Sequence, residues 1–163
     1  MPRLQLLVAT MNLTDIIGLC DKMHIASDAL IINQSDCVKY ECLFYHGYKI
    51  ECYTFAERGL SRSRNNALLR CTGEILCIAD DDMVYTDTYR EDIINEFQKH
   101  PEADALVFKV TALNDERSGK PIEKYARVGK RESREYGSVH IAIKKRALIG
   151  KNIDEILSYK KIK

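Results

Sequence analysis

The sequence predicts a single α/β domain built around a mostly parallel β-sheet. Its 163 residues fit one domain with one hydrophobic core. Apolar residues make up 45% of the chain and charged residues 30%, which are ordinary proportions for a globular protein and argue against disorder. Short apolar runs also alternate along the chain with amphipathic segments, and this alternation is typical of strands and helices that build a parallel sheet.

Leu4–Ala9 is the first expected strand, because the run is apolar and too short for a helix. A helix follows it, capped by Thr14 or by Asp15, and ends near His24. The second buried strand is Asp28–Asn33, and a polar loop comes directly after it.

A third strand is expected at residues 48–53, where polar and apolar residues partly alternate, as they do in a strand nearer the edge of a sheet. Ser61 is the expected cap of the next helix, which ends at Leu69 or Arg70. The strand at residues 74–79 is the most clearly apolar, and three aspartates follow it.

A helix capped by Thr86 comes next, since apolar side chains recur along one of its faces and Pro101 blocks its continuation. Residues 111–136 show no clean periodicity, so we expect a loop or a hairpin there. Around this segment the sequence predicts a strand at 103–108, a strand at 137–143 and a short helix at 144–149.

Charge and cysteine content argue against several classes of protein. With 25 basic and 24 acidic side chains the formal net charge is +1, so no global field favours nucleic acid as a partner. The six cysteines include no Cys-x-x-Cys pair, which argues against a zinc site. The sequence shows no signal peptide and no transmembrane segment, and we expect a cytoplasmic protein with reduced thiols.

Polar clusters follow three of the expected strands, and ligands of open α/β sheets bind outside these carboxyl ends. Thr10 and Asn12 follow the first strand, residues 33–36 the second, and Asp80–Asp82 the most apolar one. Three consecutive carboxylates repel one another unless a cation or basic groups neutralise them. Oxygen ligands favour Mg²⁺ or Mn²⁺ over zinc. The alternative is that one aspartate caps a turn and the others are solvated.

A basic cluster, Arg58–Asn65, leads into the second expected helix. Arg62 and Arg64 oppose the helix macrodipole at this end, and a bound anion would resolve the conflict by meeting both the N–H groups and the guanidinium groups. Ion pairs with Glu57 or Glu74 are the alternative. The arginines and carboxylates together predict a metal-assisted diphosphate site. The chain has no Gly-rich phosphate loop, which argues against a P-loop enzyme and against a dinucleotide-binding Rossmann domain.

Three segments, LVATMN at 7–12, RGLSRSRNNA at 58–67 and TGEILCIADDD at 72–82, carry a family resemblance. They resemble the nucleotide-sugar half of a family 2 glycosyltransferase with the Rossmann-like, three-layer GT-A fold. The resemblance spans about residues 4–110. It implies one GT-A-like domain over residues 1–163, with the nucleotide-sugar half at 1–110 and an incomplete acceptor-side half at 111–163.

The resemblance also implies a reaction and its participants. A nucleoside diphosphate sugar, with UDP the expected nucleotide, donates its sugar with inversion to the hydroxyl of a saccharide or another acceptor. The implied cofactor is Mn²⁺ or Mg²⁺. The main alternative is a non-catalytic nucleotide-binding or assembly subunit of the same fold. A nucleotidyltransferase is a third reading, but it would normally carry a Gly-rich loop near Thr10, and none is present.

By the same resemblance, Thr10 and Asn12 line the nucleotide pocket, Asn33 or Asp36 lies near the base, and Arg64 lies near the base or the diphosphate. The implied nucleotide-sugar-binding residues are Thr10, Asn12, Asn33, Asp36, Arg58, Arg62, Arg64, Asp80 and Asp81.

The aspartate triplet corresponds to the Asp-x-Asp element of the family, and it can be aligned in two registers. Asp82 is the preferred direct metal ligand, with Asp80 as the second. The catalytic base implied by the family is a carboxylate well beyond this element. Here Asp154–Glu155 is the nearest match, in reversed order, so the catalytic residue is left unassigned. We expect a shortened chain that binds nucleotide without efficient transfer.

Overall fold

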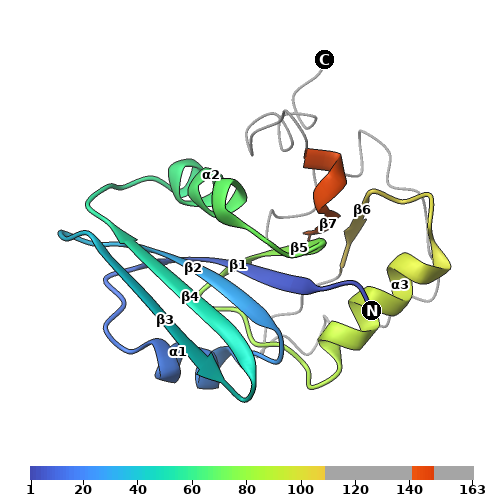
Figure 1. Cartoon of the computed structure of the whole chain (residues 1–163), viewed down its shortest axis with the longest axis horizontal. Helices are drawn as coiled ribbons and strands as arrows, with labels where there is room; N and C mark the ends of the chain where they lie inside the picture. The colour runs from blue at the N-terminus through green and yellow to red at the C-terminus, as the bar shows by residue number, and fades with distance from the viewer. Residues whose placement is uncertain (109–140, 149–163) are drawn as a thin grey trace, which may run out of the picture.

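The computed structural model describes residues 1–108 and 141–148, whose strands form one seven-stranded sheet (Figure 1). Across the sheet the strands lie in the order β3-β4-β2-β1-β5-β7-β6. The elements are β1 (Leu4–Met11), α1 (Ile16–Met23), β2 (Asp28–Gln34), β3 (Lys39–Tyr45), β4 (Tyr48–Phe55), α2 (Leu60–Arg70), β5 (Ile75–Asp80), α3 (Tyr89–Lys99), β6 (Ala105–Val107), β7 (Ile141–Lys144) and the 3-10 helix η4 (Lys145–Leu148).

The four central strands, β4, β2, β1 and β5, are parallel. The strands outside them are antiparallel: β3 pairs with β4, β7 with β5, and β6 with β7. The expected α/β class is therefore confirmed, with a parallel centre and antiparallel margins. Because the central strands are parallel, their carboxyl ends lie along one edge of the sheet, where ligands of such folds bind.

Helices cover both faces of the central strands, with α2 on one face and α1 and α3 on the other (Figure 1). Leu6, Val8 and Ile31 point into the cluster with α1 and α3, while Leu7 and Leu30 point into the cluster with α2. Burial on both faces explains why β1 and β2 are apolar along almost their whole length instead of alternating.

Of the two residues expected to cap the first helix, Asp15 is confirmed. The expectation that Thr86 caps α3 is wrong. The Asp15 side chain accepts a backbone hydrogen bond in the first turn of α1. Helix α3 begins at Tyr89, not beside Thr86, and Thr88 occupies the position before it. The Thr88 hydroxyl donates to the Asp92 carboxylate at 2.7 Å instead of capping a backbone group.

The expected cap of α2 is also wrong, because the helix begins at Leu60, one residue before Ser61. Gly59 precedes it with φ at +132°, a conformation that residues with a side chain rarely adopt. The Gly59 N–H donates to the Gln34 side-chain oxygen at 2.6 Å. This turn therefore fixes the start of α2 to the end of β2.

The strand β3 was not predicted. Only one of its faces packs against the core, but its sequence alternates weakly because the exposed face carries Tyr40, Cys42 and Phe44. Strand β6, at Ala105–Val107, is shorter than the expected 103–108. Strand β7 is Ile141–Lys144, and residues 137–140 of the expected strand lie outside the described residues. In the expected helix at 144–149, the described residues form the 3-10 helix η4. The loop expected at 111–136 and the acceptor-side pair Asp154–Glu155 lie outside the described residues.

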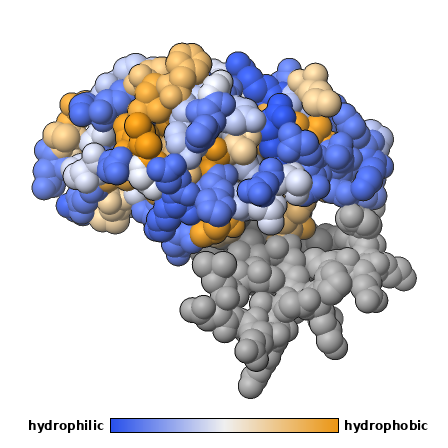
Figure 2. Space-filling model, turned by 90° about the horizontal axis from the view of Figure 1, so that it is seen from below, coloured by the Kyte–Doolittle hydropathy of each residue, from blue (hydrophilic) through white to orange (hydrophobic). Residues whose placement is uncertain are grey.

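Hydrophobic residues form separate patches among hydrophilic ones on the face seen from below in Figure 2. Apart from the first residue, the most exposed large hydrophobic side chains of the described parts are Leu69, Val38 and Phe44. None of the described helices is long and apolar enough to cross a membrane.

Candidate active site

Four chain segments meet at the carboxyl edge of the parallel strands. The turn after β1 approaches the end of β2, where the Asn12 N–H donates to the Gln34 carbonyl at 2.9 Å. The Gln34 side chain in turn holds Gly59 at the start of α2, as described above. The fourth segment is the Asp80–Asp82 turn after β5, which lies beside β1 because these two strands pair directly.

The carboxylate of Asp81 is bonded to the end of β1. The Thr10 hydroxyl donates to Asp81 Oδ2 at 2.5 Å, and Thr10 is only 5% exposed. From α1, Lys22 Nζ donates to the backbone carbonyl of Asp81 at 2.8 Å. Asp81 is therefore fixed from two sides, through its side chain and through its backbone.

The carboxylate of Asp80 is bonded to α2. Arg64 Nη2 donates to Asp80 Oδ1 at 3.0 Å, and the Arg64 side chain is 7% exposed. The two acids considered as alternative partners bond elsewhere: Glu57 accepts from a side chain of α2, and Glu74 from the backbone N–H of Arg3. An arginine thus neutralises one of the three adjacent aspartates, which lowers their mutual repulsion without a metal.

Asp82 is the exposed member of the triplet, in the turn that the Met83 N–H closes onto the Asp80 carbonyl at 3.3 Å. No three His, Cys, Asp or Glu side chains of the described residues gather in a group that could hold a metal ion. Mg²⁺ and Mn²⁺ are commonly held by one or two carboxylates together with substrate phosphates and water. The residues present therefore fit such an ion only in company with a bound diphosphate.

Asn33 is buried and holds the loop after β1. Its Oδ1 accepts from the Leu13 N–H at 2.9 Å, while its Nδ2 donates to the Leu13 carbonyl and to Thr54 Oγ1, both at 3.2 Å. The Asn33 side chain is only 3% exposed, and its hydrogen bonds hold the backbone of this loop in place. Its predicted contact with a base stays a prediction.

The remaining predicted residues lie at the rim. Arg58 and Asp36 form an exposed ion pair at 3.4 Å, a type of contact that contributes about 0–1 kcal/mol. Arg62 is exposed in the first turn of α2, which has no acidic residue and no side-chain cap. Arg62 therefore stands beside backbone N–H groups that an anion could accept from.

Sequence reasoning missed Lys22 and gave Gln34, which lies in the predicted polar cluster at 33–36, no role of its own. Gln34 had a usable signal, since it is the last residue of a buried strand whose carboxyl end faces the site. Lys22 had none, because a lysine in the last turn of an amphipathic helix is ordinary, and only the fold brings it to Asp81.

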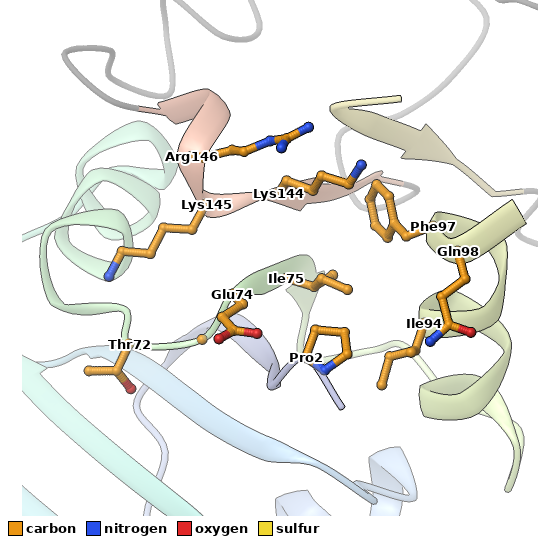
Figure 3. A pocket seen from close by; sticks show the side chains of 11 residues that line it. Pro2, Thr72, Glu74, Ile75, Ile94, Phe97, Gln98, Lys144, Lys145 and Arg146 are labelled. Carbon is orange, nitrogen blue, oxygen red and sulfur yellow. The ribbon is translucent and has the colours of Figure 1, made fainter. Parts of the chain in front are cut away.

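A cavity of about 610 Å³ lies at the opposite edge of the sheet, beside the amino ends of β1 and β5 (Figure 3). Phe97 contributes to its apolar wall from α3, and three basic residues line it from β7 and η4. Each basic side chain bonds to a protein oxygen: Lys144 at 2.8 Å, Lys145 at 2.6 Å and Arg146 at 3.3 Å. These bonds tie β7 and η4 to neighbouring loops, so the basic residues have a structural role there.

The model of glycosyl transferase family 2 matches residues 35–157 of the chain. The chain belongs to this family. No curated protein sequence matches this glycosyl transferase family 2 chain. The matched segment begins one residue after β2 ends, and it includes the start of α2 and the Asp80–Asp82 turn, which are two of the four segments that meet at the carboxyl edge.

Solved structures share the fold of this family 2 chain. The crystal structure of Staphylococcus aureus TarS 1-349 has a TM-score of 0.64 at 18% identity, covering 90% of this chain and 48% of that one. The same protein in complex with UDP-GlcNAc has a TM-score of 0.62 at 17% identity, with coverages of 90% and 46%. The mannosyltransferase PcManGT from Pyrobaculum calidifontis, in complex with GDP-Man and Mn²⁺, has a TM-score of 0.60 at 16% identity, with coverages of 92% and 47%.

These similarities confirm the expected GT-A fold class, and at such identities they show the fold alone. The chain spans about half the length of these structures.

Proposed function

We propose that this family 2 chain binds a nucleoside diphosphate sugar at the carboxyl edge of β1, β2 and β5, and transfers the sugar to an acceptor hydroxyl. The observation that carries the proposal is the Arg64–Asp80 pair, which joins the amino end of α2 to the aspartate turn. In this arrangement hydrogen-bond donors at the helix start can bind a phosphate group, and the neighbouring carboxylates can bind a metal ion.

The diphosphate is assigned to the amino end of α2. Backbone N–H groups at a helix start attract anions, and the exposed guanidinium of Arg62 adds a bidentate donor there. The buried guanidinium of Arg64 adds positive charge at the same helix end while it donates to the Asp80 carboxylate. This assignment gives Arg62 a role that helix stability does not, because a cation in the first turn opposes the macrodipole.

The nucleoside is assigned to the turns after β1 and β2. Thr10 and Asn12 line this region, and Asp36 is exposed beside it, while Asn33 keeps the loop after β1 in place. UDP is the proposed nucleotide. The family 2 match and the fold shared with a protein solved in complex with UDP-GlcNAc support this choice.

The proposed cofactor is Mn²⁺ or Mg²⁺, with Asp82 as the direct ligand and Asp80 assisting. When bound, the ion would stabilise the negative charge of the departing diphosphate. The bonds from Thr10 and Lys22 to Asp81 hold the turn that presents Asp82. A fold neighbour solved with GDP-Man and Mn²⁺ supports the metal.

The acceptor step is proposed as inversion, in which a carboxylate base takes the proton of an acceptor hydroxyl as the oxygen attacks the anomeric carbon. The acceptor is a saccharide or another hydroxyl compound. The base is unassigned, and Asp154 and Glu155 are the first candidates to substitute.

Isothermal titration with UDP tests the donor site. We expect the affinity to fall at least about tenfold, or about 1.4 kcal/mol, when EDTA replaces Mn²⁺ or when Asp82→Asn is introduced. Asp87→Asn is the matched control, since Asp87 is an exposed acid five residues further along. Equal UDP affinity with and without metal would overturn the metal assignment.

A thermal-shift panel of UDP-, GDP-, TDP- and CDP-sugars identifies the nucleotide, because binding to the folded state raises the melting temperature. Release of UDP in the presence of mixed acceptors then separates a transferase from a nucleotide-binding subunit. Acceptor-dependent release supports transfer, whereas binding without release favours the non-catalytic alternative.

A further inference from the structure

The edge strand β3 is unusually open. It pairs with β4 through seven consecutive residues without a bulge, and none of the described residues pairs with its other side. Natural edge strands are normally protected by proline, by bulges or by inward-pointing charges. Between Lys39 and Tyr45 the strand has no proline, and its two charged residues, Lys39 and Glu41, neutralise each other in an ion pair at 2.8 Å.

The turn that joins β3 to β4 shows which backbone groups face the open side. His46 and Gly47 have φ angles of 48° and 86°, and positive values at both positions are typical of a type I′ hairpin. In such a hairpin the pair beside the turn exchanges backbone hydrogen bonds, and every second pair does so after it. The N–H and C=O groups of Tyr40, Cys42 and Phe44 therefore point away from β4.

The side chains of the same three residues are exposed. They lie on the face of the sheet that carries α2, but this helix packs on β1 and β2 and leaves β3 uncovered. Phe44 is 74% exposed and Tyr40 50% exposed. The Tyr40 ring lies 4.6 Å from that of Tyr53, and its hydroxyl donates to Glu51, so the Tyr40 side chain is held in place before any partner arrives.

We propose that β3 pairs antiparallel with β3 of a second copy of this chain, with a two-fold axis at Cys42. This pairing goes beyond the proposed sugar transfer. It leaves the donor site open, because β4 separates β3 from β2, and the edge that carries Asp80–Asp82 is not part of the contact.

The strand is complementary to itself in this register. Tyr40 lies opposite Phe44 of the second copy on both sides of the axis, and aromatic cross-strand pairs stabilise antiparallel sheets. Lys39 lies opposite Tyr45 of the second copy, and the Tyr45 hydroxyl donates to Asp21 at 2.6 Å. In this register the Lys39 ammonium, which pairs with Glu41 at 2.8 Å, would lie on the same side as the carboxylate of the second copy's Asp21. One lysine and one glutamate give the strand no net charge, so two copies do not repel each other.

Cys42 provides a built-in probe of this register. The two Cys42 residues would form a hydrogen-bonded pair, in which the Cα atoms lie about 5.5 Å apart, and this separation is within the Cα–Cα range of a disulfide. Mild oxidation of the native protein with copper phenanthroline should give a covalent dimer, both in the unmodified chain and in Cys37→Ser. Cys42→Ser should give none. Cys37 is the matched control because it is also exposed, five residues away.

Analytical ultracentrifugation of the reduced protein tests the contact without a disulfide. We expect a concentration-dependent dimer, and at least a tenfold weaker one in Phe44→Lys. Leu69→Lys is the control, because Leu69 is 81% exposed on α2 and lies outside the proposed contact. Circular dichroism and retained UDP binding establish that each variant is folded and keep this test separate from the donor-site test.

Three results would overturn the pairing. The first is a monomer at every soluble concentration, and the second is a covalent dimer that survives Cys42→Ser. The third is a dimer that Leu69→Lys weakens and Phe44→Lys leaves intact, since this result would place the contact on α2.

Discussion

The hydroxyl of Thr10 donates to the carboxylate of Asp81 over 2.5 Å, although 71 positions separate the two residues in the chain. The bond depends on the register of β1 and β5, in which Ala9 lies opposite Asp80. A slip by one residue would turn either side chain to the other face of the sheet. The geometry of the aspartate turn is therefore set by strand pairing in the core.

Thr10→Val tests this link, because valine keeps the shape of threonine and removes only the hydroxyl. The Asp81 carboxylate loses its donor, and a hydrogen bond to a charged group contributes about 1.5–3 kcal/mol. We expect a loss of folding stability of this order in urea denaturation, together with weaker UDP binding. Thr86→Val, at an exposed position, should change neither quantity. Unchanged UDP affinity in Thr10→Val would remove Thr10 from the donor site.

Arg64 and Asp80 should behave as a coupled pair. Arg64→Met removes the charge and leaves an aspartate 36% exposed, so we expect a loss of about 1–3 kcal/mol in unfolding free energy. A double-mutant cycle with Asp80→Asn should give a coupling energy of at least about 0.5 kcal/mol. Arg90→Met, which breaks a more exposed pair, should change stability by less than about 0.5 kcal/mol. Additive effects in the cycle would contradict direct coupling.

UDP affinity should also fall in Arg64→Met, because the side chain lies at the proposed diphosphate site. Titration under conditions in which the variant is fully folded separates this effect from stability. A large stability loss with unchanged UDP affinity would leave Arg64 as a structural ion-pair partner only.

Asn33→Ala should destabilise the chain by about 2–4 kcal/mol. The substitution removes all three side-chain hydrogen bonds and leaves the half-buried backbone groups of Leu13 and the buried Thr54 hydroxyl without these partners. Hydrogen exchange should then speed up at the Leu13 amide more than in β5. Asn95→Ala, on the exposed side of α3, serves as the control. A stability change as small as that of Asn95→Ala would show that solvent replaces these bonds.

Folding stability should fall at alkaline pH. Burial raises the pKa of the Cys77 thiol from 9.0 to about 11, and the Cys20 and Cys52 thiols are raised similarly. Between these values the unfolded chain releases the proton while the folded chain keeps it. The stabilisation is therefore complete below pH 9 and is lost as the pH rises toward 11, by about 1.4 kcal/mol per pKa unit for each thiol.

Urea denaturation between pH 7 and pH 10.5 measures this loss. Cys77→Ala is expected to lose less stability over the range than the unmodified chain, whatever its stability at pH 7. Cys37→Ala, which removes an exposed thiol, should follow the unmodified chain. Parallel curves for Cys77→Ala and the unmodified chain would show that the Cys77 thiol does not contribute.

The carboxyl edge of the sheet could be predicted because it follows from strand order and direction. Apolar runs too short for helices marked β1, β2 and β5, and the polar residues after them meet where parallel strands end together. Thr10 and Asp81 were assigned to one site in this way, and the structure places them in direct contact.

The direction of individual side chains could not be predicted, because it depends on tertiary packing. Asn33 follows the pattern of a site residue, yet it turns inward to bond the backbone of Leu13. Helix α2 begins one residue before the Ser61 cap, because Gln34, 25 residues earlier in the chain, holds Gly59. Strand β3 was missed because its solvent-facing side chains include Tyr40, Cys42 and Phe44, so the polar–apolar alternation expected of a half-buried strand is absent.

The position of β5 between β1 and β7 has a consequence for the nascent chain during synthesis. The first neighbour, β1, is complete before β5 emerges, but the second, β7, begins only at Ile141, 61 residues after β5 ends at Asp80. At roughly 5–20 residues per second the ribosome needs about 3–12 s to reach it. During this interval strands β1 to β5 can already pair, and the free edge of β5 (Ile75–Asp80) is exposed. Slow translation of the codons for residues 81–140 would lengthen the exposure and make this edge a point of capture by chaperones or by other nascent chains.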